Sequence, residues 1–112
     1  MENLPYEEIL EKAEAGEQGS QYKLARMFHD GAGIKVNKIE AEKWSRKAAE
    51  QENVDAQYLL ACMLYYGSGI PANIVEAAQW FKKATEQGHK NAPTMFKFID
   101  DHMKLHRTIT KS

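Results

Sequence analysis

Apolar residues recur at helical spacing in short stretches of the chain, each ended by a glycine. The first two such stretches carry large apolar side chains three and four residues apart, at Leu24, Met27 and Phe28 and again at Leu60, Met63 and Leu64. This spacing places the side chains on one face of a helix. Gly31 and Gly67 follow, where glycine can adopt the left-handed conformation that ends a helix. The pattern therefore predicts helices over 20–29 and 56–66.

The chain is similar to itself at an offset of 36 residues. Residues 19–54 and 55–90 are identical at 16 of these 36 positions. The identities include both tryptophans, both Gly-x-Gly-Ile loops and several alanines, at Trp44 and Trp80, 31–34 and 67–70, Ala41 and Ala77, and Ala48 and Ala84. A period of this length is typical of a solenoid, in which each helical unit buries its apolar face against its neighbours.

A second helix is expected in each repeat, beginning at Asn37 or Asn73. Each asparagine is followed three residues later by a glutamate, Glu40 or Glu76. That pattern is typical of a capping box, in which the two side chains satisfy free amide donors at the start of a helix. The alanines of these helices let neighbouring backbones approach closely, and each tryptophan fills the remaining space.

Both ends of the chain continue the same register. We expect a capping helix of the second type over 5–16, a capping helix of the first type over 91–106, and a loose tail over 107–112. Lys97 stands where the repeats have alanine, which suits a last helix with no further repeat beside it. We therefore predict one all-α domain over 1–112. It would be an α/α superhelix of about six helices, with repeats at 19–54 and 55–90 and a half-repeat at each end.

The repeat resembles the SEL-one-like repeat family, whose members are related to tetratricopeptide repeats. The resemblance covers roughly residues 10 to 100 and rests on Ala56-Gln57, Leu60-Ala61, Met63-Leu64, Gly67-x-Gly69-Ile70, Asn73, Ala77, Trp80, Lys83-Ala84 and Gln87-Gly88. The chain departs from the family where Asn37 and Asn73 replace the usual aspartate and Glu52 replaces the usual glycine. The resemblance implies a non-enzymatic scaffold or adaptor that binds proteins along a concave surface lined by the first helix of each repeat.

Positions that differ between repeats are free for function if the identical positions form the architecture. Three equivalent sets on the first helices differ in this way: Lys23, Leu59 and Met95; Arg26, Cys62 and Phe98; and Asp30, Tyr66 and His102. They are charged near the N-terminus and apolar or aromatic further along, and an exposed apolar patch is typical of a binding site. We predict that they line a groove for a protein or peptide partner. The alternative is that Leu59, Cys62, Met95 and Phe98 pack on each other between adjacent helices.

Composition and charge exclude several other classes of function. The 15 basic and 16 acidic residues give a net charge of −1 without a basic run, which argues against nucleic-acid binding. No apolar run approaches the ~18 residues of a membrane helix, and the N-terminus does not resemble a secretory signal. The single cysteine, Cys62, excludes an intrachain disulfide and fits a reducing compartment. We expect a cytoplasmic protein that is a monomer or a weak homodimer.

Candidate chemistry is sparse. The Gly-x-Gly loops lack the Lys-Ser/Thr of a phosphate-binding loop, and no nucleophile, base and orienting group come together. His102 and His106 could share a helix face, but solvated histidines are favoured over a metal site. His29 and His89 stand near predicted helix ends, where helix capping is favoured over catalysis. We expect no enzymatic activity, cofactor or metal. The alternative function is an immunity or inhibitor protein that neutralises a toxin or enzyme by direct binding.

Overall fold

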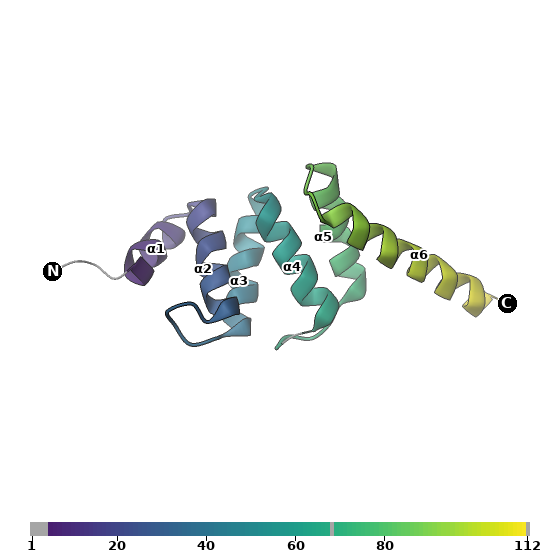
Figure 1. Cartoon of the computed structure of the whole chain (residues 1–112), viewed down its shortest axis with the longest axis horizontal. Helices are drawn as coiled ribbons and strands as arrows, with labels where there is room; N and C mark the ends of the chain where they lie inside the picture. Colours follow the sequence, from purple (N-terminus) through teal and green to yellow (C-terminus); the bar gives the residue numbers. More distant parts are fainter. Residues whose placement is uncertain (1–4, 68, 112) are drawn as a thin grey trace.

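The computed structural model describes the backbone of residues 5–67 and 69–111, and the side chains of these residues up to 104. Six helices follow one another in a single elongated stack (Figure 1). They are α1 (Pro5–Glu14), α2 (Gln18–Asp30), α3 (Lys38–Glu50), α4 (Val54–Tyr66), α5 (Ile74–Glu86) and α6 (Ala92–Lys111). All regular secondary structure in the described residues is helical, and the predicted all-α solenoid is confirmed.

Asparagine side chains start α3 and α5, as the sequence predicts. Asn37 Oδ1 accepts the backbone N–H of Glu40 at 3.1 Å, and Asn73 Oδ1 accepts that of Glu76 at 3.0 Å. Only this half of each predicted capping box forms. The backbone N–H of each asparagine donates instead to a carbonyl near the end of the preceding helix, which fastens the loop to that helix. The two glutamates are therefore free to make other contacts.

Gly31 and Gly67 end the first helix of each repeat in the left-handed conformation, at φ +74° and +64°. Their backbone N–H groups donate to Met27 O at 2.8 Å and to Met63 O at 2.9 Å. These bonds satisfy carbonyls that the ending helix would otherwise leave without a partner. Identical glycines thus produce identical helix ends in both repeats.

The last helix is longer than predicted. α6 continues to Lys111, so the loose tail expected from residue 107 is wrong for 107–111, and Ser112 lies outside the described residues. The physical reason is that no glycine or proline follows Pro93, so nothing in the sequence stops the helix. His89 caps its start: Nδ1 accepts the N–H groups of Asn91 at 3.0 Å and Ala92 at 3.1 Å. The His89 ring also stacks on Tyr58 of α4, with 4.2 Å between ring centroids.

The core consists of two joined clusters. One is centred on Leu24, Trp44 and Met63, and the other on Leu60, Phe81 and Ile99. Tyr22 and Ile70 pack against both clusters, so the isoleucine of the second loop helps to join the repeats. The alanines at the helix crossings have no exposed surface, at Ala25, Ala41, Ala48, Ala61, Ala77 and Ala84. The repeated alanines are therefore architecture, as the sequence predicts.

Buried glutamines tie each repeat to the helix before it. Gln21 Nε2 donates to Ala13 O at 3.1 Å, and the equivalent Gln57 Nε2 donates to Ala49 O at 3.2 Å. Gln51 completes the first of these junctions, because its Nε2 donates to Gln21 Oε1 at 2.8 Å. A buried amide with both ends bonded costs little to desolvate.

The second junction differs because Glu52 stands where the first has Gly16. Glu52 holds a left-handed φ of +72°, the only non-glycine residue in the described chain to do so. Its carboxylate accepts a hydrogen bond from Gln87 Nε2, and Gln57 Oε1 has no partner among the described residues although it is buried. Glu52 therefore diverts the side chain that would complete this junction.

Candidate partner-binding groove

The first helix of each repeat faces the same side of the stack. α2, α4 and α6 lie on the near side in Figure 1, with α3 and α5 behind them. The residues predicted to line a groove lie on these three helices. Their surroundings change along the stack.

The N-terminal part of this face is charged, and its charges pair with each other. Arg26 donates to Asp30 Oδ2 through Nη2 at 2.9 Å and through Nε at 3.1 Å, and to Tyr22 Oη at 3.2 Å. His29 Nδ1 lies 2.9 Å from the other Asp30 oxygen. The His29 and Arg26 hydrogen bonds lower the pKa of Asp30, so its carboxylate stays ionised. Groups already paired in this way gain little from a charged partner.

The middle of the face is less accessible than predicted. Leu59 is only 8% exposed and packs in the cluster of Leu24, Trp44 and Met63, so its expected place in the groove is wrong. The reason is that α4 lies at the centre of the stack and has neighbours on both sides. Cys62 is half-buried against the second cluster, and burial raises the pKa of its thiol. A thiol in that state is a poor nucleophile at neutral pH.

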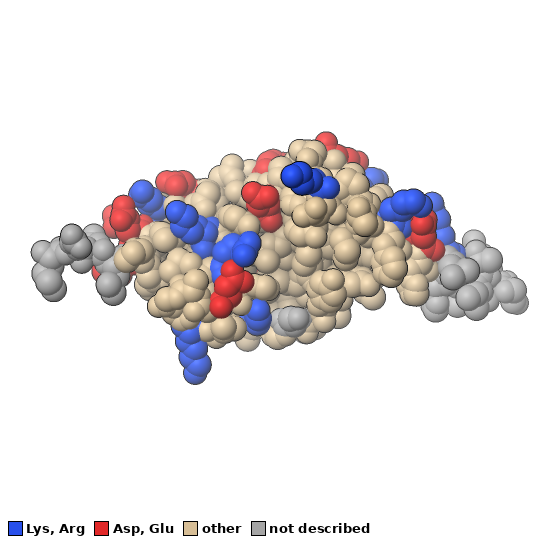
Figure 2. All heavy atoms as spheres, viewed as in Figure 1, with Lys and Arg blue, Asp and Glu red and all other residues tan. Residues whose placement is uncertain are grey.

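The C-terminal part of the face holds an aromatic cleft between α4 and α6, which we define by Tyr65, Tyr66 and Phe98. Tyr66 is 64% exposed and Phe98 is 58% exposed. Two adjoining hollows of about 330 and 320 Å³ share these three residues. The first hollow adds Ile74, Ile99 and His102, and the second adds Thr94 and Met95. In Figure 2, the face between the lower end of α4 and the half of α6 closest to α4 shows no lysine, arginine, aspartate or glutamate.

Four of the nine predicted groove residues thus come together: Tyr66, Met95, Phe98 and His102. Sequence comparison missed Tyr65, whose ring packs edge-on against Tyr66 at 4.9 Å, and Ile74 at the start of α5. Both could have been found by the same criterion. Tyr65 is equivalent to His29, and Ile74 is equivalent to Lys38, so both positions differ between the repeats.

The solvent side of α6 is charged. Lys97 Nζ lies 2.9 Å from Asp101, and Lys104 Nζ lies 2.9 Å from Asp100. Lys97 occupies the position at which the repeats have a buried alanine. A further repeat would have to bury these charges, which is costly. α6 therefore presents charge to solvent and aromatic surface to the groove.

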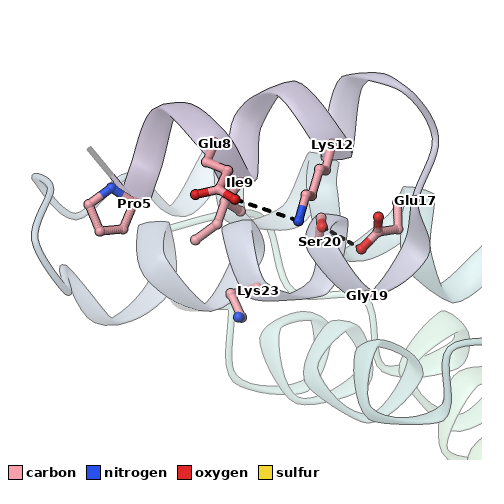
Figure 3. A pocket seen from close by; sticks show the side chains of 8 residues that line it. All are labelled: Pro5, Glu8, Ile9, Lys12, Glu17, Gly19, Ser20 and Lys23. Carbon is pink, nitrogen blue, oxygen red and sulfur yellow. Dashed lines mark hydrogen bonds and ion pairs between the residues drawn. The ribbon is translucent and has the colours of Figure 1, made fainter. Parts of the chain in front are cut away.

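A third hollow, of about 470 Å³, lies apart from the cleft, between α1 and α2 (Figure 3). Lys23, predicted for the groove, lines it. Its charged side chains are of both signs: Lys12 pairs with Glu8 at 3.7 Å, and Glu17 accepts a hydrogen bond from Ser20 at 2.7 Å. This mixed lining favours no class of ligand over another.

Within the described residues, no helix combines the length and the apolar character needed to cross a membrane. The described side chains also form no group of three histidines, cysteines or acids that could hold a metal ion. The side chain of His106 lies outside the described residues, so its expected solvation is untested.

A family model described as Sel1 repeat matches residues 18–53 and 54–89, each beginning one residue before the predicted repeat. A Sel1 repeat protein from Oxalobacter formigenes is 28% identical, with a TM-score of 0.77 over 80% of this chain and 67% of that one. Cysteine rich protein B of Helicobacter pylori has a TM-score of 0.75 over 80% of this chain and 68% of that one; at 21% identity it shows the fold alone.

A protective antigen present in uropathogenic Escherichia coli strains, which displays an SLR fold, is 32% identical with a TM-score of 0.78. The match covers 84% of this chain and 20% of that one, so the chain spans about a fifth of the antigen's length. No curated protein matches the sequence.

Proposed function

Because the chain belongs to the Sel1 repeat family, whose members are generally protein-interaction modules, we propose that it is a non-enzymatic adaptor that holds a protein or peptide partner in its groove. The contact centre is the aromatic cleft of Tyr65, Tyr66 and Phe98. The cytoplasmic location stays a prediction.

The observation that carries the proposal is the exposure of Tyr66 and Phe98 beside two hollows. Taking ~200 Å² for an aromatic side chain, these two residues leave roughly 250 Å² of ring surface in water. Tyrosine and phenylalanine are enriched in the cores of protein interfaces, and tyrosine is frequent among the residues that dominate binding energy. A partner would insert an apolar side chain into a hollow and cover the rings.

The charges support an adaptor more than an immunity or inhibitor protein. A tight inhibitor is expected to offer unpaired charges of one sign to its target, which raise the rate of association. Here Arg26, Asp30 and His29 satisfy one another, and the two hollows of the cleft are lined by no lysine, arginine, aspartate or glutamate. Binding would therefore depend on apolar contacts and would weaken little as salt is added.

The test compares capture of proteins from a native lysate by three forms of the chain. Tyr66→Ala combined with Phe98→Ala removes the cleft. Ile39→Ala combined with Val75→Ala is the matched control, because Ile39 and Val75 are 70% and 57% exposed but lie on α3 and α5. Circular dichroism verifies that each variant is folded.

We expect a partner that the wild type and the α3/α5 control retain and that the cleft variant loses. Equal retention by all three folded forms would contradict the proposal. So would equal loss from both variants, because binding would then not be centred on the cleft.

A further inference from the structure

We propose that the aromatic cleft also joins two copies of this chain in a weak symmetric dimer, with the two α6 helices antiparallel and Phe98 on the twofold axis. This inference does not depend on the proposed function, although a dimer and a partner would compete for the same surface. It rests on the shape, the spacing and the area of the cleft.

The shape of the cleft is complementary to itself. Phe98 is exposed and lines both hollows, one together with Met95 and the other together with His102. A twofold interface uses the same patch on both copies, so that patch must offer both the projection and the cavity that receives it. Each hollow, at about 320 to 330 Å³, has room for an aromatic side chain. A second copy can therefore place its own Phe98 beside this one.

Three side chains on one side of α6 have the spacing that two paired helices use. Met95, Phe98 and His102 stand three and four residues apart, which places them in one row along the helix. Phe98 and His102 are exposed, whereas Met95 packs partly against the second core cluster, in which Ile99 is buried. α6 is also 20 residues long, against 13 for α5, the helix on which it packs. A second α6 could lie along the exposed Phe98 and His102 without disturbing the core.

The area available predicts a weak dimer. Tyr66 and Phe98 expose roughly 250 Å² of ring surface, and Ile74, which is 44% exposed, extends it. A stable interface buries about 800 Å² on each partner. The aromatic core thus supplies about a third of that area, so we expect dissociation in the micromolar range or weaker. At low concentration the cleft would be open to another partner.

The first experiment is sedimentation velocity of the full chain over a concentration series from about 5 µM to 1 mM. We expect the weight-average mass to rise towards that of a dimer for the wild type and for Lys97→Ala, whose side chain lies on the solvent side of α6. Phe98→Asp should remain monomeric. If Phe98→Asp loses its helical signal in circular dichroism, Tyr66→Ala takes its place. A wild type that stays monomeric to 1 mM, or a Phe98→Asp variant that dimerises as the wild type does, overturns the proposal.

The second experiment tests the antiparallel arrangement. With Phe98 on the axis, Thr94 of one copy faces His102 of the other. In a Cys62→Ser background, Thr94→Cys and His102→Cys proteins are mixed and oxidised, and each is also oxidised alone. We expect the mixed disulfide to exceed either self-linked product at least several-fold. Self-linked products that equal or exceed it would overturn the geometry. Neither result bears on lysate capture, so this proposal and the proposed function can fail separately.

Discussion

Gly67 ends α4 directly after Tyr66, so replacing it with alanine tests how the fold positions the cleft. The residue holds φ +64°, and a Cβ built there would lie 2.9 Å from Ala72 Cβ, 3.2 Å from Ala72 N and 3.3 Å from Ala72 Cα. Two of these three atoms are backbone, so the clash cannot be relieved by rotating a flexible side chain. Gly33 is the matched control, because it holds φ +81° and a Cβ there meets nothing within 4 Å.

The control isolates the backbone contribution to the cost. A left-handed conformation costs an L-residue roughly 1–2 kcal/mol. Alanine regains about 0.4–1 kcal/mol by restricting the unfolded chain. Gly33→Ala should therefore lower the free energy of unfolding by about 1 kcal/mol. Gly67→Ala adds an overpacking cost of about 1–3 kcal/mol, for a total of about 2–4 kcal/mol.

The assay is urea and thermal unfolding of both variants, followed by circular dichroism. The difference of about 1–3 kcal/mol between them should separate their melting temperatures by roughly 4 °C or more. Tyrosine fluorescence reports whether the end of α4 is altered before global unfolding. Equal destabilisation by Gly67→Ala and Gly33→Ala would refute the reasoning, because the contact with Ala72 would then carry no cost.

Two further substitutions address charges at the repeat junctions. Arg46 donates a hydrogen bond of 2.6 Å to Glu76 and lowers the pKa of that carboxylate. The pair therefore stabilises the fold fully above the unfolded pKa of about 4.3, and this stabilisation is lost as the pH falls through the lower folded pKa. Glu76→Gln should cost about 0.5–1 kcal/mol at pH 7 and flatten the acid limb of a stability–pH curve; an unchanged acid limb would contradict this. Glu52→Gly should raise the melting temperature by a few degrees, because glycine adopts the left-handed φ of +72° without the steric cost and because Gln87 becomes free to bond Gln57 Oε1. A lower melting temperature would mean that the hydrogen bonds and the ion pair of the Glu52 carboxylate outweigh both gains.

The repeat period made the fold predictable. Identical residues at equivalent positions, such as Asn37 and Asn73 or Gly31 and Gly67, produce identical caps, so the order and type of the helices could be inferred from one comparison of the chain with itself. What could not be inferred was the end of α6. A helix end without a glycine or proline depends on the balance between propensity and solvation, and the sequence holds no local signal for it.

Difference between repeats was a weaker guide to the site. Leu59 differs from its equivalents and yet is buried, because α4 has neighbours on both sides. Ser45 and Phe81 are also equivalent and different, and both are fully buried. At such positions the two repeats place side chains of different size in the core, and both side chains stay buried. Exposure depends on the position of the helix in the stack as well as on its repeat register.

The last helix shows why both criteria are needed. Ile99 is buried and packs α6 on the core. Lys97 is charged at the position where the two repeats have a buried alanine, and Phe98, between these two residues, is aromatic and exposed. If α6 were only a solubilising cap, its groove side would be expected to become polar as its outer side has. Ending the stack needs charge only where the next repeat would have packed. An exposed phenylalanine on the other side does not help to close the solenoid, and the proposed contacts with a partner or a second copy would account for it.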